Sequence, residues 1–187
     1  MSGVNQAGDT TSAVLYRDGH KLIETDSAWT DMEVPADAAR YRLKLTTSRN
    51  LPDWKYGVAT ATSWSFASAR TDTATPLPLL QFDYQVPVDA HNTLRAGRTH
   101  AIGVHVRAQD GLSAPRGVTI RVEASYDDGR TWRTAEVTDR GHNAFRARVA
   151  GPSQSAAVAW VTLRVTARDA AGNTVRQTVQ RAYALQR

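Results

Sequence analysis

The sequence predicts an all-β protein made of two β-sandwich domains, the second of which is immunoglobulin-like or fibronectin-III-like. Three observations lead to this prediction. Apolar and polar residues alternate with period two over most segments, clusters of Gly, Pro, Asp and Asn separate these segments, and helical periodicity is missing between them. The chain of 187 residues with 41% hydrophobic content is also long enough to bury substantial cores.

The first domain, residues 1–77, is expected to be a small and incomplete sandwich with about five strands. Its clearest element is the stretch "AVLYRDGHKLIET", residues 13–25, which predicts a hairpin. The pair Asp18 and Gly19 supplies the positive φ angles that a tight hairpin turn needs. Further strands are expected at Ala28–Val34, Arg40–Thr47 and Val58–Ala69.

The boundary between the domains is placed in "RTDTATPLPLL", residues 70–80. Pro76 and Pro78 lack the amide donors that a central strand needs, and the polar run before them breaks the alternation. The second domain therefore covers residues 78–187.

The second domain is expected to contain about seven short strands, as immunoglobulin-like sandwiches do. From Gly117 onward, Val118, Ile120 and Val122 alternate with polar residues, so one face of the strand is apolar and the other is polar. The stretch that begins at Ala159 repeats this pattern. The remaining strands are expected at Leu79–Val88, His100–Ala108, Thr131–Thr138, Asn143–Val149 and Thr174–Leu185.

Composition excludes several classes of site. The chain has no cysteine, so disulfides, thiol nucleophiles and cysteine-based metal sites are excluded, and no cofactor is expected. Its net charge is +5, most of its basic residues are arginines, and the basic excess lies after residue 78. No apolar run approaches the roughly 18 residues of a membrane span, and the N-terminus lacks the pattern of a secretory signal peptide.

The stretch "SYDDGRTW", Ser125 to Trp132, has the spacing of the Asp-box of some secreted hydrolases. Propellers of that class carry one such box in each of several blades, and this chain is too short for a propeller. We interpret the stretch as a structural turn in which Asp127 accepts turn amides, Gly129 takes a positive φ and Trp132 fills core volume. Asp128 is expected to face solvent. The turn residues are Ser125, Asp127, Gly129, Thr131 and Trp132.

A second turn of the same kind is expected in "RDAAGNT", Arg168 to Thr174. Asp169, Gly172 and Asn173 are expected to join the last two strands there. A calcium ion at these turns stays an open alternative, although the carboxylates are too few for a calcium-binding loop motif.

The sequence predicts neither a metal site nor a catalytic site. His100 and His105 are five residues apart on one expected strand, so they point to opposite faces and do not bind one ion together. His20, His91 and His142 fall in turns, and solvated surface histidines are the expectation. No Gly-x-Ser-x-Gly elbow occurs, so no serine has the setting of a nucleophile.

Four arginines take outward positions in the alternation, and they raise the hypothesis of a basic stripe that binds nucleic acid. The outward positions carry no interleaved aromatic residues on which bases could stack. We therefore favour a solvated sandwich face, with no nucleic acid as a partner. The four residues are Arg121, Arg146, Arg148 and Arg164.

The order of three segments carries a resemblance to a known family: "WSFASARTDTATPLPLLQFDYQVPVDAHN", then "SYDDGRTW", then "VTLRVTARDAAGNTVRQTVQRAYAL". From about Ala13 to Leu185 the chain resembles the C-terminal β-sandwich region of large secreted bacterial subtilisin-like serine peptidases. The family's catalytic segments, which hold its aspartate, histidine and serine, do not occur here. The resemblance implies a non-catalytic accessory region, an extracellular parent protein that is a serine-type endopeptidase, and a chain that is a fragment of it or a truncated reading frame.

Two classes of function follow. In the first, the chain is an appendage that stabilises, positions or targets the peptidase, and its partner is the parent's catalytic domain or a protein at the cell surface. In the second, the chain is a free-standing carbohydrate-binding or adhesive sandwich, and Trp29, Trp54 and Trp64 form a stacking platform for sugars. A row of exposed tryptophans would favour the second class, and burial would favour the first.

Overall fold

The computed structural model describes residues 9–27, 30–51, 53–97, 99–152 and 158–186. Every regular element in these residues is a β-strand, which confirms the all-β prediction. The strands are β1 (Asp9–Arg17), β2 (His20–Thr25), β3 (Ala39–Arg49), β4 (Ala59–Ser68), β5 (Leu80–Gln85), β6 (Thr93–Arg95), β7 (Thr99–Ala108), β8 (Thr119–Ser125), β9 (Arg133–Thr134), β10 (Glu136–Asp139), β11 (Ala144–Ala150), β12 (Val158–Arg168) and β13 (Thr174–Gln186).

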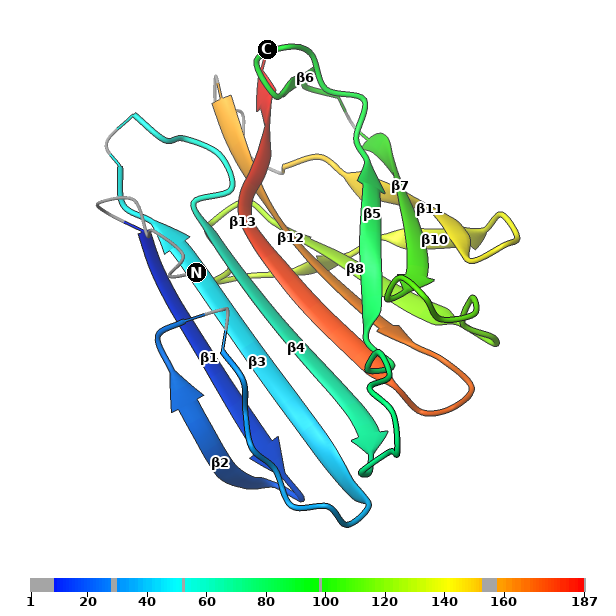
Figure 1. The fold of residues 1–187 in the computed structure, drawn as a ribbon. Helices are drawn as coiled ribbons and strands as arrows, with labels where there is room; N and C mark the ends of the chain where they lie inside the picture. Colours follow the sequence, from blue (N-terminus) through cyan, green and yellow to red (C-terminus); the bar gives the residue numbers. More distant parts are fainter. Residues whose placement is uncertain (1–8, 28–29, 52, 98, 153–157, 187) are drawn as a thin grey trace.

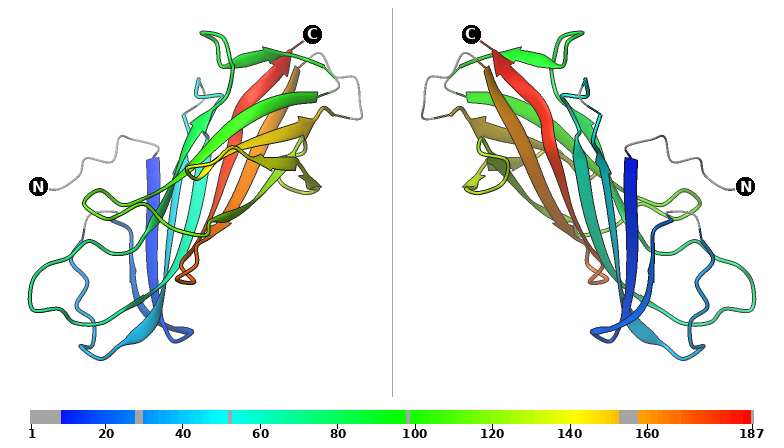
Figure 2. Two further views of the ribbon diagram at one scale, coloured as in Figure 1. Left: turned by 90° about the vertical axis from the view of Figure 1, so that its right-hand side faces the viewer. Right: turned by 90° about the vertical axis from the view of Figure 1, so that its left-hand side faces the viewer.

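The strands form two sheets. The large, nine-stranded sheet has the order β2-β1-β3-β4-β13-β12-β8-β9, with the short β6 parallel to β13, and the small, four-stranded sheet has the order β10-β11-β7-β5. Figure 1 shows the long strands of the large sheet side by side. Figure 2 shows that the small sheet packs against one face of the large sheet and leaves β1 and β2 outside the two-layered part.

Two hydrophobic clusters join the sheets, because the apolar side chains of both face the space between them. In the larger cluster, Ile102 of β7 and Val149 of β11 lie with Val161 of β12, and each is at most 1% exposed. In the second, Leu80 of β5 lies with Val175 of β13. The two-layered part of the fold is therefore a β-sandwich whose core the alternation correctly predicts.

The predicted hairpin at the start of the chain is confirmed. β1 and β2 pair from Arg17–His20 to Ala13–Thr25. Asp18 and Gly19 have φ angles of +48° and +87°, so this pair forms the left-handed turn that its residue types favour.

The strand expected at Ala28–Val34 is wrong. Residues 28 and 29 lie outside the described residues, and residues 30–34 are an irregular loop. Pro35 follows them directly and has no amide hydrogen for a ladder. Met32 instead packs on the inner face of the large sheet, against the third hydrophobic cluster of Leu15, Tyr41 and Phe66. The alternation of apolar and polar residues in this segment therefore belongs to a loop that covers the sheet, and not to a strand.

The two halves of the chain share the large sheet. β4 comes before the predicted boundary and β13 after it, and they pair antiparallel from Ser65–Thr174 to Ala59–Gln180. The four strands before residue 78 extend the large sheet and do not build a second pair of sheets. Independent folding of residues 78–187 stays a prediction, for which a test is given below.

The strand expected at Thr131–Thr138 is divided between the sheets. β9 pairs with β8 in the large sheet, and β10 pairs with β11 in the small sheet. Ala135 lies between them, is buried, and donates its N–H to the Val122 carbonyl at 2.8 Å. The other strands expected after residue 78 are observed within a few residues of their predicted bounds.

Candidate functional site

The turn from Ser125 to Trp132 follows β8, and its polar atoms bind one another. The Asp127 carboxylate accepts hydrogen bonds from the Thr131 amide at 2.8 Å and from the Thr131 hydroxyl at 2.6 Å. It also accepts the Ser125 hydroxyl at 2.7 Å. These hydrogen bonds, those from Thr131 first, hold the pKa of Asp127 well below its usual value.

Ser125 is buried at the base of this turn. Its Oγ accepts the Gly129 amide at 2.8 Å, and Gly129 has the positive φ, +93°, that was expected. The carboxylate and the hydroxyl of the Asp-box spacing are therefore both engaged within the turn, and a ligand would have to compete with backbone amides for them.

Trp132 does not fill core volume, so that part of the interpretation is wrong. The indole is half-buried, and its Nε1 donates to the Gly129 carbonyl at 2.9 Å. The Arg164 guanidinium lies 3.9 Å from the centre of its ring, and Arg164 is in turn held by Glu123 at 2.7 and 2.9 Å. Because Arg164 projects from the outward side of β12, the ring lies on the surface of the large sheet and not between the sheets.

Asp128 is exposed, as expected, but it has a partner. Its carboxylate binds the Arg181 guanidinium at 3.0 and 2.8 Å. Arg181 has a φ of +52°, beside the point where the register of β12 and β13 shifts. The Arg181 amide donates to the Thr162 hydroxyl at 3.1 Å. The Asp128–Arg181 salt bridge thus connects the turn to a β-bulge in β13. The spacing of residues in the sequence does not predict this contact.

The second turn joins β12 to β13 in the same manner. The Asp169 carboxylate accepts the Asn173 amide at 2.8 Å and the Asn173 side-chain nitrogen at 2.9 Å. Gly172 has a φ of +83° and donates its N–H to the Asp169 carbonyl at 3.1 Å. In the described residues, no group of three or more His, Cys, Asp or Glu side chains is placed to hold a metal ion.

The tryptophans named as a stacking platform do not lie together. Trp64 faces the inner side of β4, where it packs against two hydrophobic clusters and donates its N–H to the Leu80 carbonyl at 2.8 Å. Trp54 lies in the loop between β3 and β4 and is 46% exposed, with the Arg49 guanidinium 4.5 Å from its ring centre. Trp29 lies outside the described residues.

His100 and His105 lie on opposite sides of β7, as the alternation predicts. His105 is on the outward side of the small sheet, with its Nδ1 3.4 Å from Asp83. His100 is on the inward side, where it hydrogen-bonds the buried Tyr183 hydroxyl. Burial lowers the pKa of His100, so this histidine departs from the solvated surface position expected of it.

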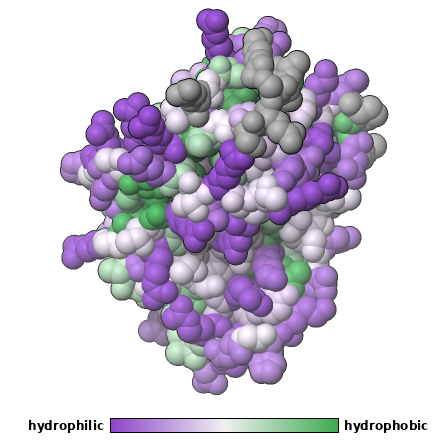
Figure 3. All heavy atoms as spheres, turned by 180° about the vertical axis from the view of Figure 1, so that it is seen from behind, coloured by the Kyte–Doolittle hydropathy of each residue, from purple (hydrophilic) through white to green (hydrophobic). Residues whose placement is uncertain are grey.

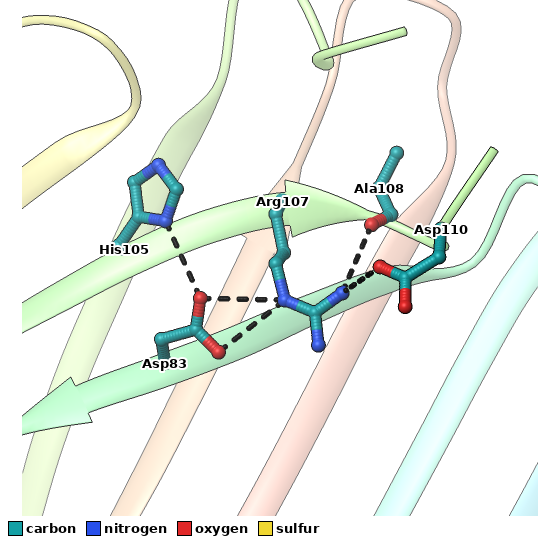
Figure 4. A network of polar contacts seen from close by, with 5 residues as sticks. All are labelled: Asp83, His105, Arg107, Ala108 and Asp110. Carbon is teal, nitrogen blue, oxygen red and sulfur yellow. Dashed lines mark hydrogen bonds and ion pairs between the residues drawn. The ribbon is translucent and has the colours of Figure 1, made fainter. Parts of the chain in front are cut away.

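Asp83 and Arg107 are part of a polar network on the outward side of the small sheet, which Figure 4 shows. The Arg107 guanidinium lies 3.3 Å from Asp83 and 3.0 Å from Asp110. A shallow hollow of about 730 Å³ adjoins the network, with Gly103, Ala144 and Arg146 in its lining. Asp83 and His105 are each about half exposed, so the network can bind a polar ligand, and it contains no hydroxyl or thiol nucleophile.

A larger, apolar hollow of about 930 Å³ lies between the inner face of β1, β3 and β4 and the loop 30–36. Leu15, Tyr41 and Phe66 line its floor, and Val34 and Leu77 line its rim. Val34 and Leu77 are both exposed, so part of this apolar surface is open to solvent.

The four arginines of the proposed basic stripe do not share a face. Arg146 and Arg148 project from β11, on the outward side of the small sheet. Arg121 and Arg164 project from β8 and β12, on the outward side of the large sheet, and both contact Glu123. The stripe suggested by the alternation is thus divided between two surfaces.

Comparisons with known proteins leave the resemblance to subtilisin-like peptidases as a hypothesis. No protein-family model matches the chain, and a search of curated proteins finds no significant match. Within the described residues, no helix is long and apolar enough to cross a membrane.

Proposed function

We propose that the chain is a non-catalytic accessory region of a secreted, extracellular subtilisin-like serine peptidase, which stabilises, positions or targets the catalytic part. The order of the motifs quoted above supports this assignment. The positions of the tryptophans argue against the alternative, a free-standing sugar-binding module. Trp64 packs in the core and Trp54 lies on the surface beside Arg49, so these two rings do not form an exposed row.

The proposal includes an immunoglobulin-like topology for residues 78–187. In constant-type immunoglobulin domains, strands A, B, E and D form one sheet and strands C, F and G the other. With β5, β7, β8, β10, β11, β12 and β13 taken as A to G, the small sheet has the order D-E-B-A and the large sheet contains G-F-C. This agreement supports the topology, with β6 and β9 as short additions.

An appendage of this kind needs a surface for a protein partner, which we propose is the catalytic domain of the parent or a protein at the cell surface. The apolar hollow over β1, β3 and β4 is consistent with such a contact, because Val34 and Leu77 leave part of its apolar lining exposed to solvent. The turns that resemble Asp-boxes are assigned structural roles.

The first experiment recovers the native polypeptide. An antibody raised against this chain is used to precipitate protein from the cells and medium of the source organism, and the product is sized and mapped by mass spectrometry. We expect peptides of a subtilisin-like catalytic domain, in the same polypeptide or in equal amount. A product that contains this chain alone would overturn the peptidase assignment.

The second experiment tests the non-catalytic assignment. We expect the purified chain to leave casein and chromogenic peptides uncleaved, because the catalytic segments of the peptidase family do not occur in its sequence. Cleavage that survives repurification and is abolished by a serine-directed inhibitor would refute it.

A further inference from the structure

Alternation and register bring basic residues from both halves of the chain onto one face of the large sheet. Tyr41, Phe66 and Val175 are buried on the inner side of β3, β4 and β13, so the residues that alternate with them face outward. We call the outward side of β3, β4, β13, β12 and β8 the cationic face. Its basic residues are Arg40, Arg42 and Lys44 of β3, Arg176 of β13, Arg164 and Arg168 of β12, and Arg121 of β8.

The charge on this face is largely uncompensated. Glu123 is the one acidic residue at the outward positions of these five strands, and it forms salt bridges with Arg164 and Arg121 at 2.7 and 3.1 Å, so its single charge balances one of these two. The other basic residues of the face form no salt bridge within the described part of the chain. Arg42 and Lys44 instead lie over the Tyr16 ring, at 4.3 and 5.2 Å from its centre.

The face also has a defined shape. β4 lies between β3 and β13, so Ser63 has Lys44 on one side and Arg176 on the other. Neighbouring strands are about 4.8 Å apart, which places the basic rows of β3 and β13 about 10 Å apart. The outward side chains of β4 are small and uncharged, so they form an uncharged strip between these rows; they are Ala59, Ala61, Ser63, Ser65 and Ala67.

The surroundings of this strip are polar. Figure 3, the view from behind, shows a mostly hydrophilic surface with small and scattered hydrophobic patches. Hydroxyl side chains alternate with the basic residues, among them Thr46 of β3, Thr166 of β12 and Thr178 of β13. Hydroxyl groups donate and accept hydrogen bonds, and a guanidinium binds a carboxylate or sulfate through two parallel N–H groups. The face therefore matches a chain that carries both hydroxyl and anionic groups.

The aromatic residues at the borders of the face distinguish between polyanions. Tyr16 is covered by Arg42 and Lys44, and Trp132 is covered by Arg164 at 3.9 Å. Trp160, at an outward position of β12, has the Tyr56 ring 5.1 Å and the Arg181 guanidinium 5.7 Å from its centre. Each of these rings thus has a partner within the chain, which leaves less ring surface on which nucleic-acid bases or neutral sugars stack. The face is built of strands alone, and the described strands offer no projecting element with which to enter a DNA groove.

We propose that the cationic face binds an acidic polysaccharide, which lies along β4 with its carboxylate or sulfate groups paired to the basic rows of β3 and β13. The inference depends on register, charge and shape. It holds with or without a peptidase origin of the chain, so its test and the test of the proposed function can fail separately.

The test measures binding of the full chain to immobilised heparin, which carries sulfates, and to polygalacturonate, which carries carboxylates, in about 50 mM NaCl. Dextran and duplex DNA are the comparison ligands. The test variant is Arg42→Gln/Lys44→Gln. The matched control is Arg146→Gln/Arg148→Gln on the small sheet, which removes the same charge and likewise breaks no salt bridge within the described residues.

We expect the test variant to weaken binding about tenfold and the control less than about twofold, because each exposed ion pair contributes up to about a factor of five. Ser63→Glu, which removes no basic residue, should weaken binding as well. The tighter of the two acidic glycans identifies the anionic group. Equal weakening by both double variants, failure to bind either acidic glycan, or tighter binding of DNA than of both would overturn the proposal.

Discussion

Deletion of one buried hydroxyl tests the structural role of the first turn. Ser125 is 1% exposed, and its Oγ donates to Asp127 at 2.7 Å and accepts the Gly129 amide at 2.8 Å. The Asp127 amide also donates to this Oγ, at 3.3 Å, so Ser125→Ala removes three hydrogen bonds and leaves the Gly129 and Asp127 amides without that partner. An unpaired buried donor costs about 1–3 kcal/mol of the free energy of unfolding.

For a domain of this length, each kcal/mol changes the melting temperature by about 2–4 °C, so Ser125→Ala should melt about 2–12 °C earlier. The matched control is Ser113→Ala in an exposed loop, where the change should stay within about 0.5 kcal/mol. Thermal unfolding followed by circular dichroism measures both. Asp127→Ala should also melt earlier, because the same turn loses its acceptor for Thr131.

Two results would refute this reasoning. The first is a Ser125→Ala protein that melts with the wild type. The second is an Asp127→Ala protein of unchanged stability that has lost binding to a glycan, which would make the turn a functional site.

Three further predictions follow from the packing and the pKa shifts. Trp132→Ala should lower the free energy of unfolding, measured in urea, by about 1–2 kcal/mol, because it removes one cation–π contact and one hydrogen bond. Phe66→Ala, at a buried position, should lower it by about 3–5 kcal/mol, and equal losses in the two variants would contradict the surface position of Trp132. Because the pKa of His100 in the folded protein lies below its ordinary 6.5, the wild type should lose stability as the pH falls through about 6.5, and His100→Gln should remove that part of the loss. Melting temperatures of the two proteins that change equally from pH 8 to pH 5 would contradict this prediction. Residues 79–187 alone should unfold in one cooperative urea transition, because every buried residue of the two clusters between the sheets lies in that segment; an unfolded fragment beside a folded full chain would refute the boundary.

The sequence predicts local structure in this chain better than it predicts how distant strands meet. Period-two alternation locates most strands, since one face of each is buried, and the Asp18-Gly19 pair locates the first hairpin. Local patterns do not determine the pairing of β4 with β13, because that pairing joins residues about 110 to 120 positions apart in the sequence. For this reason the sequence suggests two separate sandwiches, whereas in the structure strands from both halves share one large sheet.

The candidate sites show the same limit. The turn hydrogen bonds of Asp127 and Asp169 span four residues, so residue types at fixed spacing point to them. The partner of Asp128 is Arg181, 53 residues away, and no spacing rule reaches it. The cationic face is also invisible in sequence, since it combines residues of β3 with residues of β13, β12 and β8. The basic excess counted after residue 78 gives no sign of the part that β3 contributes.

The central position of β13 has a consequence for synthesis of the chain. β13 is made after every other described strand, yet it lies between β4 and β12 in the large sheet. At about 5–20 residues per second, roughly 5–20 s pass between the emergence of β4 and that of β13 from the ribosome. During that interval the edge of β4 has no partner and can pair with another nascent chain. Its residues are mostly Ala, Thr and Ser, with few large apolar side chains, so the composition of β4 also limits aggregation before β13 is made.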